Sequence, residues 1–341
     1  MLPDAPTLLS GAMLVSLVIY ALLGGADFGG GVWDLLSRGR RAGDQRRLIA
    51  SAIGPVWETN HIWVVIAVVV LFTAFPRAFA VVSTALFVPV TLLLAGIVLR
   101  GAGFAFHAYR IHEDGEPGRW GAVFAAASLL TPVLLGVTIG AMSSGKIRSD
   151  ALLFTADTSA WLAPFPLSVG LLTLAVFAYI AATYLILETP DPGLQDDFRA
   201  RGLRAAAVFA FLSVLVPVLA RSGAPDFYNA LTGSDWSIPL VMLTGTSALG
   251  AYVALHLRVY SLARACAALQ SALVIFGWGL AQFPYVVRPN LTIYDTAASP
   301  SMLRLMIYAL AAGAVFLFPS VFLLFRIFKK DALSGRHGHR A

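Results

Sequence analysis

Nine long apolar segments constrain what this chain of 341 residues can fold into. A transmembrane helix needs about 20 mostly apolar residues in succession, and each segment is compatible with that length. The alternation of apolar and polar residues that indicates a transmembrane barrel is absent over comparable lengths. We therefore predict an all-α integral membrane protein with one transmembrane domain over residues 1–341 and helices at 8–36, 48–74, 77–99, 120–141, 161–187, 204–221, 237–257, 264–283 and 302–328.

The composition agrees with this class and excludes others. Charged residues make up 12% of the chain, about half of the roughly 25% usual in soluble domains. The single cysteine, Cys266, excludes a disulfide framework and a cysteine-rich metal site, and no Cys-x-x-Cys-His motif is present to attach a c-type haem. The basic residues behind the net charge of +6 are scattered among short loops, so we do not expect nucleic-acid binding. We expect no metal site in this chain.

The distribution of basic residues predicts the orientation of the chain. With nine helices, one side of the membrane receives 18 of the 24 Lys and Arg residues, and the other receives 6. An even number of helices would remove this alternation. Because cytoplasmic loops are enriched in Lys and Arg, the N-terminus is predicted outside and the C-terminus in the cytoplasm. No basic residue precedes Arg38, so the first apolar segment lacks the positive region of a secretory signal and is expected to be a retained helix.

Two acids inside the first two segments are the main candidate functional residues. Asp27 and Glu58 each lie eleven residues from the nearest basic residue of the loop that joins these segments. At 1.5 Å per residue, both are expected about 16 Å from the cytoplasmic boundary. Two carboxyl groups in a low dielectric tend to hold a shared proton, which suits a proton relay. The alternative is a structural polar cluster in which Asn60 or His61 pairs with an acid.

His61 follows Glu58 by three residues, so the two side chains share one helix face. Such a histidine could be a haem ligand, a proton carrier or a hydrogen-bond partner of Glu58. A bis-histidine haem needs a second buried histidine, and His256 near the inner end of the seventh segment is the only other one that we assign to a helix. We therefore expect His61 to be hydrogen-bonded to Glu58, and we assign the other histidines to loops or the tail (His107, His112, His337 and His339).

Three further large side chains are candidates to line a pathway or an interface. Trp57 and Trp63 flank Glu58 well inside the segment, where core packing is the expected role and pathway lining is the alternative. Arg100 lies at the inner end of the third segment, and such a residue is expected to extend toward the lipid headgroups.

These residues together resemble the second subunit of cytochrome bd-type quinol oxidases, in its compact, cyanide-insensitive-oxidase-like branch. That family carries Asp-Gly-x-Asp-x-Gly in its first helix, and Pro-x-Trp-(Asp/Glu)-x-Asn-x-x-Trp followed by Phe-Pro in its second. The second-helix motif is specific, and the resemblance covers nearly the whole chain. The matching runs are Gly24-Gly25-Ala26-Asp27-Phe28-Gly29, Pro55-Val56-Trp57-Glu58-Thr59-Asn60-His61-Ile62-Trp63, Phe75-Pro76, Arg100-Gly101-Ala102-Gly103-Phe104, Thr183-Tyr184-Leu185 and Leu291-Thr292-Ile293-Tyr294-Asp295-Thr296-Ala297-Ala298-Ser299.

The resemblance implies a division of labour within a complex of the bacterial cytoplasmic (inner) membrane. A partner, subunit I, would carry haems b and d and the quinol site, and the heterodimer would reduce O2 to water with proton uptake from the cytoplasm. This chain would bind no haem and would contribute stability, an oxygen route and part of the proton path. Membrane lipid and a small third subunit are further expected partners, and the helices are expected to form two four-helix bundles plus one peripheral helix.

One departure from the family pattern and one rival hypothesis remain. Gly24 stands where many members have the first Asp, so a proton path that needed that carboxyl would be interrupted or rerouted. The rival function is a proton-coupled secondary transporter that uses Asp27 and Glu58 at a midplane site. No clear inverted repeat supports that hypothesis. A scaffold whose polar cluster only fixes helix register is a third alternative.

Overall fold

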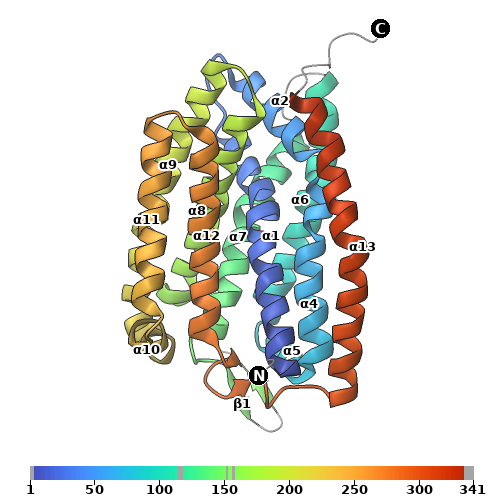
Figure 1. Ribbon diagram of the computed structural model, residues 1–341, viewed down its shortest axis with the longest axis vertical. Helices are drawn as coiled ribbons and strands as arrows, with labels where there is room; N and C mark the ends of the chain where they lie inside the picture. The colour runs from blue at the N-terminus through green and yellow to red at the C-terminus, as the bar shows by residue number, and fades with distance from the viewer. Residues whose placement is uncertain (1–3, 114–117, 151–152, 156–157, 334–341) are drawn as a thin grey trace.

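A bundle of helices aligned with one long axis forms the body of the protein (Figure 1). The computed structural model describes residues 4–113, 118–150, 153–155 and 158–333. Nine helical segments within these ranges are long and apolar enough to cross a membrane, which confirms the predicted fold class. The elements are α1 (Ala5–Leu35), α2 (Ala42–Ile53), α3 (Trp57–Asn60), α4 (Ile62–Ala74), α5 (Pro76–Ala85), α6 (Phe87–Glu113), α7 (Arg119–Ser143), β1 (Arg148–Asp150), β2 (Leu153–Thr155), η1 (Thr158–Ala160), α8 (Pro164–Leu185), η2 (Ile186–Glu188), α9 (Pro192–Gly223), α10 (Pro225–Gly233), α11 (Ser237–His256), α12 (Tyr260–Gln282), β3 (Tyr285–Val287), β4 (Leu291–Thr292) and α13 (Pro300–Leu333).

The second and third predicted helices are each divided by proline. Proline has no backbone N–H, so it cannot bond to the carbonyl four residues earlier. Pro55 follows the end of α2 and separates it from α3, and Pro76 is the first residue of α5. Pro89 leaves the carbonyl of Ala85, the last residue of α5, without its usual helical partner. The predicted segment 48–74 is divided at Pro55 and again at His61, which gives three helices. The predicted segment 77–99 lies across two helices.

Two helices extend well beyond their predicted ends. α6 continues to Glu113 rather than ending near residue 99, and α9 begins at Pro192 rather than near residue 204. In both cases the added turns contain charged residues, which lower the hydropathy without interrupting the backbone hydrogen bonds of the helix. Hydropathy marks the apolar part of a helix, and the helix itself continues past that part.

α8 is the central helix of the bundle, and α13 lies at its periphery. α8 contacts α1, α7, α9 and α12, and 67% of an apolar stretch of 18 residues in this helix is buried. The indole of Trp33 on α1 donates a hydrogen bond of 2.8 Å to the carbonyl of Ala178 on α8. The apolar stretch of 18 residues in α13 has no buried residue. Among the described elements, this helix packs closely against α1 and α4 (Figure 1). The grouping into two four-helix bundles and the orientation across the membrane stay predictions.

Short elements close the end of the bundle at which α1 begins (Figure 1). β1 and β2 form one antiparallel hairpin, β3 and β4 form another, and α10 lies at the same end. The backbone N–H of Arg288 donates to the carbonyl of Met142 at 3.0 Å, which joins the second hairpin to the end of α7. The sequence predicts only loops in these two places.

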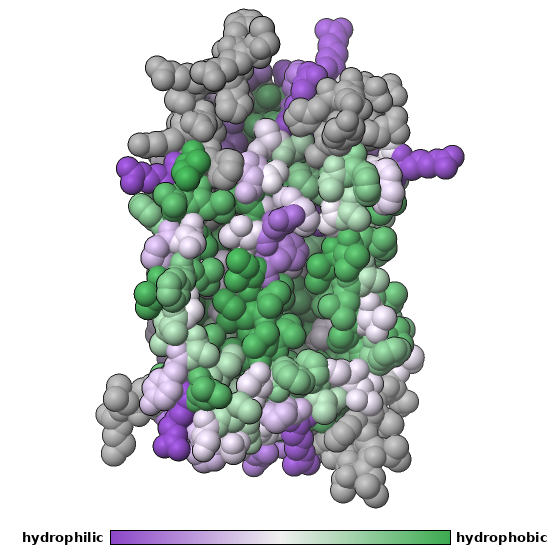
Figure 2. Space-filling view, turned by 90° about the vertical axis from the view of Figure 1, so that its right-hand side faces the viewer, coloured by the Kyte–Doolittle hydropathy of each residue, from purple (hydrophilic) through white to green (hydrophobic). Residues whose placement is uncertain are grey.

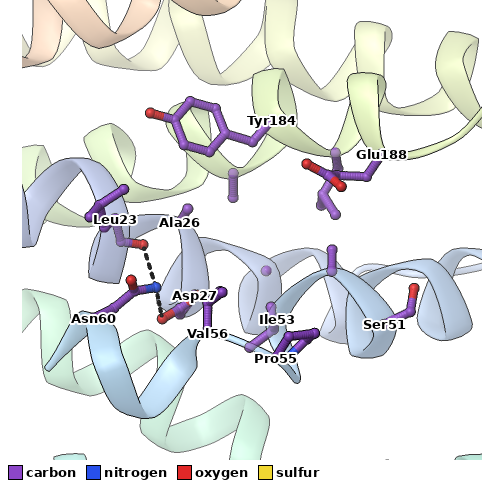
Figure 3. Close-up of a pocket in the computed structure, with 14 residues that line it drawn as sticks. Leu23, Ala26, Asp27, Ser51, Ile53, Pro55, Val56, Asn60, Tyr184 and Glu188 are labelled. Atoms are coloured by element: carbon purple, nitrogen blue, oxygen red, sulfur yellow. Dashed lines mark hydrogen bonds between the residues drawn. The ribbon is translucent and has the colours of Figure 1, made fainter. Parts of the chain in front are cut away.

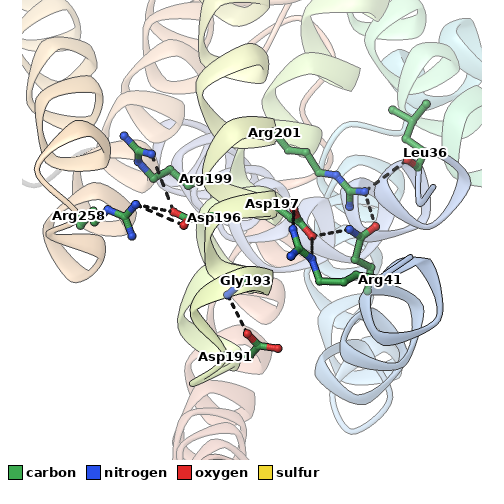
Figure 4. Close-up of polar contacts among 10 residues, drawn as sticks. Leu36, Arg41, Asp191, Gly193, Asp196, Asp197, Arg199, Arg201 and Arg258 are labelled. Carbon is green, nitrogen blue, oxygen red and sulfur yellow. Dashed lines mark hydrogen bonds and ion pairs between the residues drawn. The ribbon is translucent and has the colours of Figure 1, made fainter. Parts of the chain in front are cut away.

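A charged network joins the helices at the opposite end of the bundle (Figure 4). Arg41, at the start of α2, bonds to both carboxylate oxygens of Asp197 on α9, at 2.8 and 2.5 Å. Gln45 donates to the same carboxylate at 2.7 Å and accepts a 2.7 Å hydrogen bond from the buried Arg201. The hydrogen bond to Asp197, together with its charge, raises the pKa of Arg41 above its ordinary value.

The outer surface of the bundle is apolar between two hydrophilic ends. Figure 2 shows this pattern on the face that carries the right-hand helices of Figure 1, where one hydrophilic patch lies within the upper part of the apolar band. On α4 the exposed large apolar side chains are those of Ile62, Val65, Val68, Val69 and Phe72. A surface of this kind is suited to lipid or to the helices of a partner.

Candidate functional site

The short helix α3 directs one polar side chain into the bundle and another to its outer surface. Asn60 is 3% exposed and points inward, whereas Glu58, two residues earlier, is exposed. Residues two apart on a helix do not share a face, which accounts for the difference. The four residues of α3, between the break at Pro55 and the start of α4, therefore place one amide inside the chain and one carboxyl outside it.

Asp27 lies on the inner side of this junction (Figure 3). It is 3% exposed on α1, and the Asn60 amide donates a hydrogen bond of 2.9 Å to its Oδ2. The same amide nitrogen is 3.4 Å from the carbonyl oxygen of Leu23. The structure thus brings Asp27 and Asn60 together, as one of the sequence alternatives expects.

The predicted carboxyl pair of Asp27 and Glu58 is not formed within this chain. The side chain bonded to Asp27 is that of Asn60, and the Glu58 carboxyl is exposed on the outer surface. Sequence spacing gives the depth of a residue along a helix but not the direction in which its side chain points. The expectation of a proton shared directly between these two acids was therefore wrong for the chain by itself.

Arg100 does not extend to the headgroups, which corrects a second expectation. It is fully buried, with 0% exposure, on α6. Its guanidinium carbon lies 5.3–5.7 Å from the ring centres of four aromatic residues. Guanidinium groups stack on aromatic faces, and the guanidinium nitrogens of Arg100 have no hydrogen-bond partner among the described residues. The four rings belong to Phe28, Trp57, Phe104 and Phe124.

His61 and the two tryptophans occupy different environments. The Nδ1 atom of His61 is 2.9 Å from the backbone carbonyl oxygen of Trp57, so the expected hydrogen bond to Glu58 is replaced by one within the helix turn. Trp57 contacts His61 and lies over Arg100, which places it beside the polar interior. Trp63 is 6% exposed and packs against Phe318 of α13, in the core role expected for it.

A second buried polar pair, Asp34 and His107, was missed by the sequence analysis. His107 is 2% exposed on α6, and its Nε2 lies 3.1 Å from Oδ2 of Asp34, which is 4% exposed on α1. The assignment of His107 to a loop was wrong because α6 continues beyond its apolar part. His107 follows Arg100 by seven residues, and Asp34 follows Asp27 by seven residues. This equal spacing was the signal that could have revealed the pair.

The half-buried His61 and the buried His107 are each surrounded by side chains of this chain. His61 is surrounded by rings of the same chain, with centres 5.8–6.3 Å away. His107 is bonded to Asp34 and stacked on Phe124 with ring centres 5.6 Å apart. Within the described ranges, no cluster of three or more His, Cys, Asp or Glu side chains is arranged to hold a metal ion.

A pocket of about 130 Å³ leads from the surface toward Asp27 (Figure 3). It lies between α1, the connection from α2 to α3, and the end of α8 with η2. Asp27 and Asn60 are on its wall at one end, with Tyr184 across the pocket from them, and Ser51 and Glu188 are on its wall toward the other end. The site therefore combines a buried acid, an amide donor and a small pocket with polar groups at both ends.

Comparison with known proteins identifies the family. The family model described as cytochrome bd terminal oxidase subunit II matches residues 5–328. The chain belongs to this family. Its function is thus that of a subunit of an oxidoreductase complex, and the comparisons lend no support to the transporter hypothesis.

Individual relatives agree with this membership. The cytochrome bd-I ubiquinol oxidase subunit 2 of Escherichia coli K12 is 27% identical over 362 residues, which cover 93% of this subunit II chain and 90% of that protein. A putative cytochrome bd menaquinol oxidase subunit II of Bacillus subtilis 168 is 20% identical over 324 residues, with 92% of each chain covered. The solved bd oxidase from Geobacillus thermodenitrificans shares the fold, with a TM-score of 0.80, 24% identity and coverage of 95% of this chain and 98% of that one.

Proposed function

We propose that this chain pairs with a haem-bearing subunit I in the bacterial cytoplasmic membrane and that the complex oxidises quinol with O2. Two quinols would reduce one O2 to two waters, so the four protons that form water must reach the oxygen site. Haems b and d would be held by subunit I, since His61 and His107 are surrounded by aromatic rings of their own chain. A small third subunit and bound lipid would complete the assembly.

Within this complex, the chain would deliver protons to subunit I through Asp27, Asn60 and Glu58. One observation carries this role: the inner side of α3 holds the Asp27 carboxyl through Asn60, while the outer side of the same short helix exposes Glu58. A carboxyl exposed on a helix at bilayer depth is costly in lipid and usually faces a partner, a cavity or an ion path. The face of α3 that carries Glu58 would therefore lie against subunit I.

A relay of this kind does not need direct contact between the acids. Asn60 holds Asp27 in place, and its amide and carbonyl groups can orient a water that connects Asp27 to Glu58. The Asn60 carbonyl oxygen is buried and has no hydrogen-bond partner among the described residues, so it is available to such a water.

The test compares Glu58→Gln, Glu58→Asp and Asp27→Asn in the complex with subunit I, reconstituted in vesicles. Glu58→Gln and Asp27→Asn should lower the rate of proton uptake on reaction with O2 by roughly 100-fold. Glu58→Asp should restore most of it, because it keeps an acid on the exposed side of α3. Asp235→Asn, which removes an exposed acid at the other end of the bundle, is the matched control.

Assembly is checked separately by the visible absorption spectrum and subunit content of each purified complex. Glu58 is exposed in this chain, so its replacement by Gln leaves the fold of the chain intact. Wild-type uptake in a fully assembled Glu58→Gln complex would remove Glu58 from the pathway. Wild-type uptake in both the Glu58→Gln and the Asp27→Asn complexes would refute the proposed role of the chain.

A further inference from the structure

The pocket beside Asp27 opens at the end of the bundle that carries α2 and η2 (Figures 1 and 3). At its inner end are the Asp27 carboxyl and the Asn60 amide, both 3% exposed. Toward its mouth are the exposed Ser51 of α2 and the half-buried Glu188 of η2. The pocket therefore extends between two carboxyl groups that lie on different helices and at different depths.

The dimensions and lining of the pocket suit water. A volume of about 130 Å³ is several times the roughly 10–15 Å³ that a single water needs on the same measure, so the pocket has room for a chain of waters. Water occupies such a space when polar partners are present, and here Glu188 and Ser51 are near one end and Asp27, Asn60 and Tyr184 near the other. The walls between them are formed mainly by small or aliphatic side chains, among them Ala26, Ala52 and Leu185.

Gly24 provides no carboxyl on α1 that could bring protons to Asp27. A side chain at this position would meet the Tyr20 ring, whose Cε2 atom would be 2.7 Å from the added Cβ. The Tyr20 ring therefore fills the space next to Gly24, and no carboxyl is present there to bring a proton to Asp27. Glu188 is a carboxyl that lines the same pocket as Asp27, and it comes from α8 and η2 rather than from α1.

We propose that this pocket is a water-filled proton inlet, in which Glu188 collects protons at the mouth and the waters pass them to Asp27. The proposal rests on the proposed role of Asp27 in proton delivery and adds where the protons enter. Each step moves one proton between oxygen atoms along hydrogen-bonded water, so no bond other than O–H is made or broken. An acidic group at the mouth of a cleft raises the local concentration of cations and the rate at which they arrive.

Two independent variants test the inlet in the reconstituted complex. Glu188→Gln removes the collecting carboxylate, and Ser51→Leu places an apolar side chain at the mouth, where the exposed Ser51 leaves room for it. Each should lower the rate of proton uptake on reaction with O2 by roughly tenfold. Glu188→Asp should recover most of the Glu188→Gln loss, which a purely structural role of this residue would not require.

The matched control is Asp191→Asn, three residues from Glu188. Asp191 caps α9 by accepting a 2.7 Å hydrogen bond from the Gly193 N–H and does not line the pocket, and Asn is an equally good cap (Figure 4). This variant should keep wild-type uptake. Loss of uptake in it equal to that of Glu188→Gln would indicate a general effect of surface charge and overturn the inlet.

The outcomes separate this proposal from the one on which it rests. If Glu188→Gln and Ser51→Leu both keep wild-type uptake while Asp27→Asn loses it, protons reach Asp27 by another way and the inlet is refuted. If Asp27→Asn also keeps wild-type uptake, the delivery role itself fails. If Ser51→Leu lowers uptake and Glu188→Gln does not, the collecting role of Glu188 is refuted.

Discussion

Nε2 of His107 lies 3.1 Å from Oδ2 of Asp34, seven residues further along α6 and α1 than Arg100 and Asp27. Both helices run in the same direction through the bundle, so this pair lies about two helical turns beyond Asp27 and Arg100. The His107–Asp34 contact links α1 to α6 directly, whereas the Asp27 carboxyl is held by Asn60 and the guanidinium nitrogens of Arg100 have no hydrogen-bond partner in the described part of the chain. The polar interior therefore has a second level, separate from the proposed proton pathway.

Replacement of His107 by Phe should destabilise the complex, because it leaves the Asp34 carboxyl buried without its partner. An unsatisfied buried polar group costs about 1–3 kcal/mol. The double variant His107→Phe with Asp34→Leu should lose less stability than the single variant, since it removes both polar groups. Unfolding of the purified complex with chemical denaturant measures the difference, and a double variant less stable than the single one would show that the pair is not coupled.

Arg100→Lys should behave as a severe substitution although it keeps the positive charge. The guanidinium of Arg100 is stacked among four aromatic rings, an environment that an ammonium group cannot fill in the same way. We expect the yield of assembled complex to fall several-fold, measured by subunit content after purification. Arg264→Lys is the matched control, because Arg264 lies over a single ring, that of Tyr184. Equal yields for the two variants would contradict the aromatic enclosure of Arg100 as its stabilising feature.

The sequence predicts the spans of this protein well because hydropathy and helix length are local properties of the chain. Membership of the family also follows from a local motif around Glu58. The direction in which each side chain points depends instead on how the helices pack, and this is where the expectations for Glu58 and Arg100 were wrong. The burial of His107 was hidden for a related reason: the polar turns of α6 resemble a loop in composition, although they remain helical.

The charged network at the α2 end predicts unequal effects of two neighbouring substitutions. Arg41 is half exposed, so Arg41→Ala should change the stability of the complex little, and less still in high salt. Gln45 is 4% exposed, and its replacement by Ala leaves the buried Arg201 without its 2.7 Å hydrogen bond. Gln45→Ala should therefore cost about 1–3 kcal/mol. Denaturant unfolding at low and high salt measures both effects, and a larger loss for Arg41→Ala would reverse the expected order.

Gly29→Ala should disrupt the contact between α1 and the central helix α8. A Cβ at this position would overlap the backbone carbonyl oxygen of Phe177 and lie 2.6 Å from the Cβ of Ala181. A backbone atom cannot move aside as a flexible side chain can, so the helices must separate, at a cost of about 1–3 kcal/mol or more. Separation would also shift Asp27, two residues earlier on α1, relative to the pocket wall formed by α8.

The control for this prediction lies on the same helix. Gly11→Ala adds the same methyl group to α1 at a position with nothing within 4 Å, so it should keep wild-type stability and proton uptake. Both substitutions raise the helix propensity of α1 equally, so propensity cannot account for a difference between them. Thermal unfolding and proton uptake of the assembled complexes are measured side by side. If Gly29→Ala matched Gly11→Ala in both, the close approach of α1 to α8 would not be what holds Asp27 at the pocket.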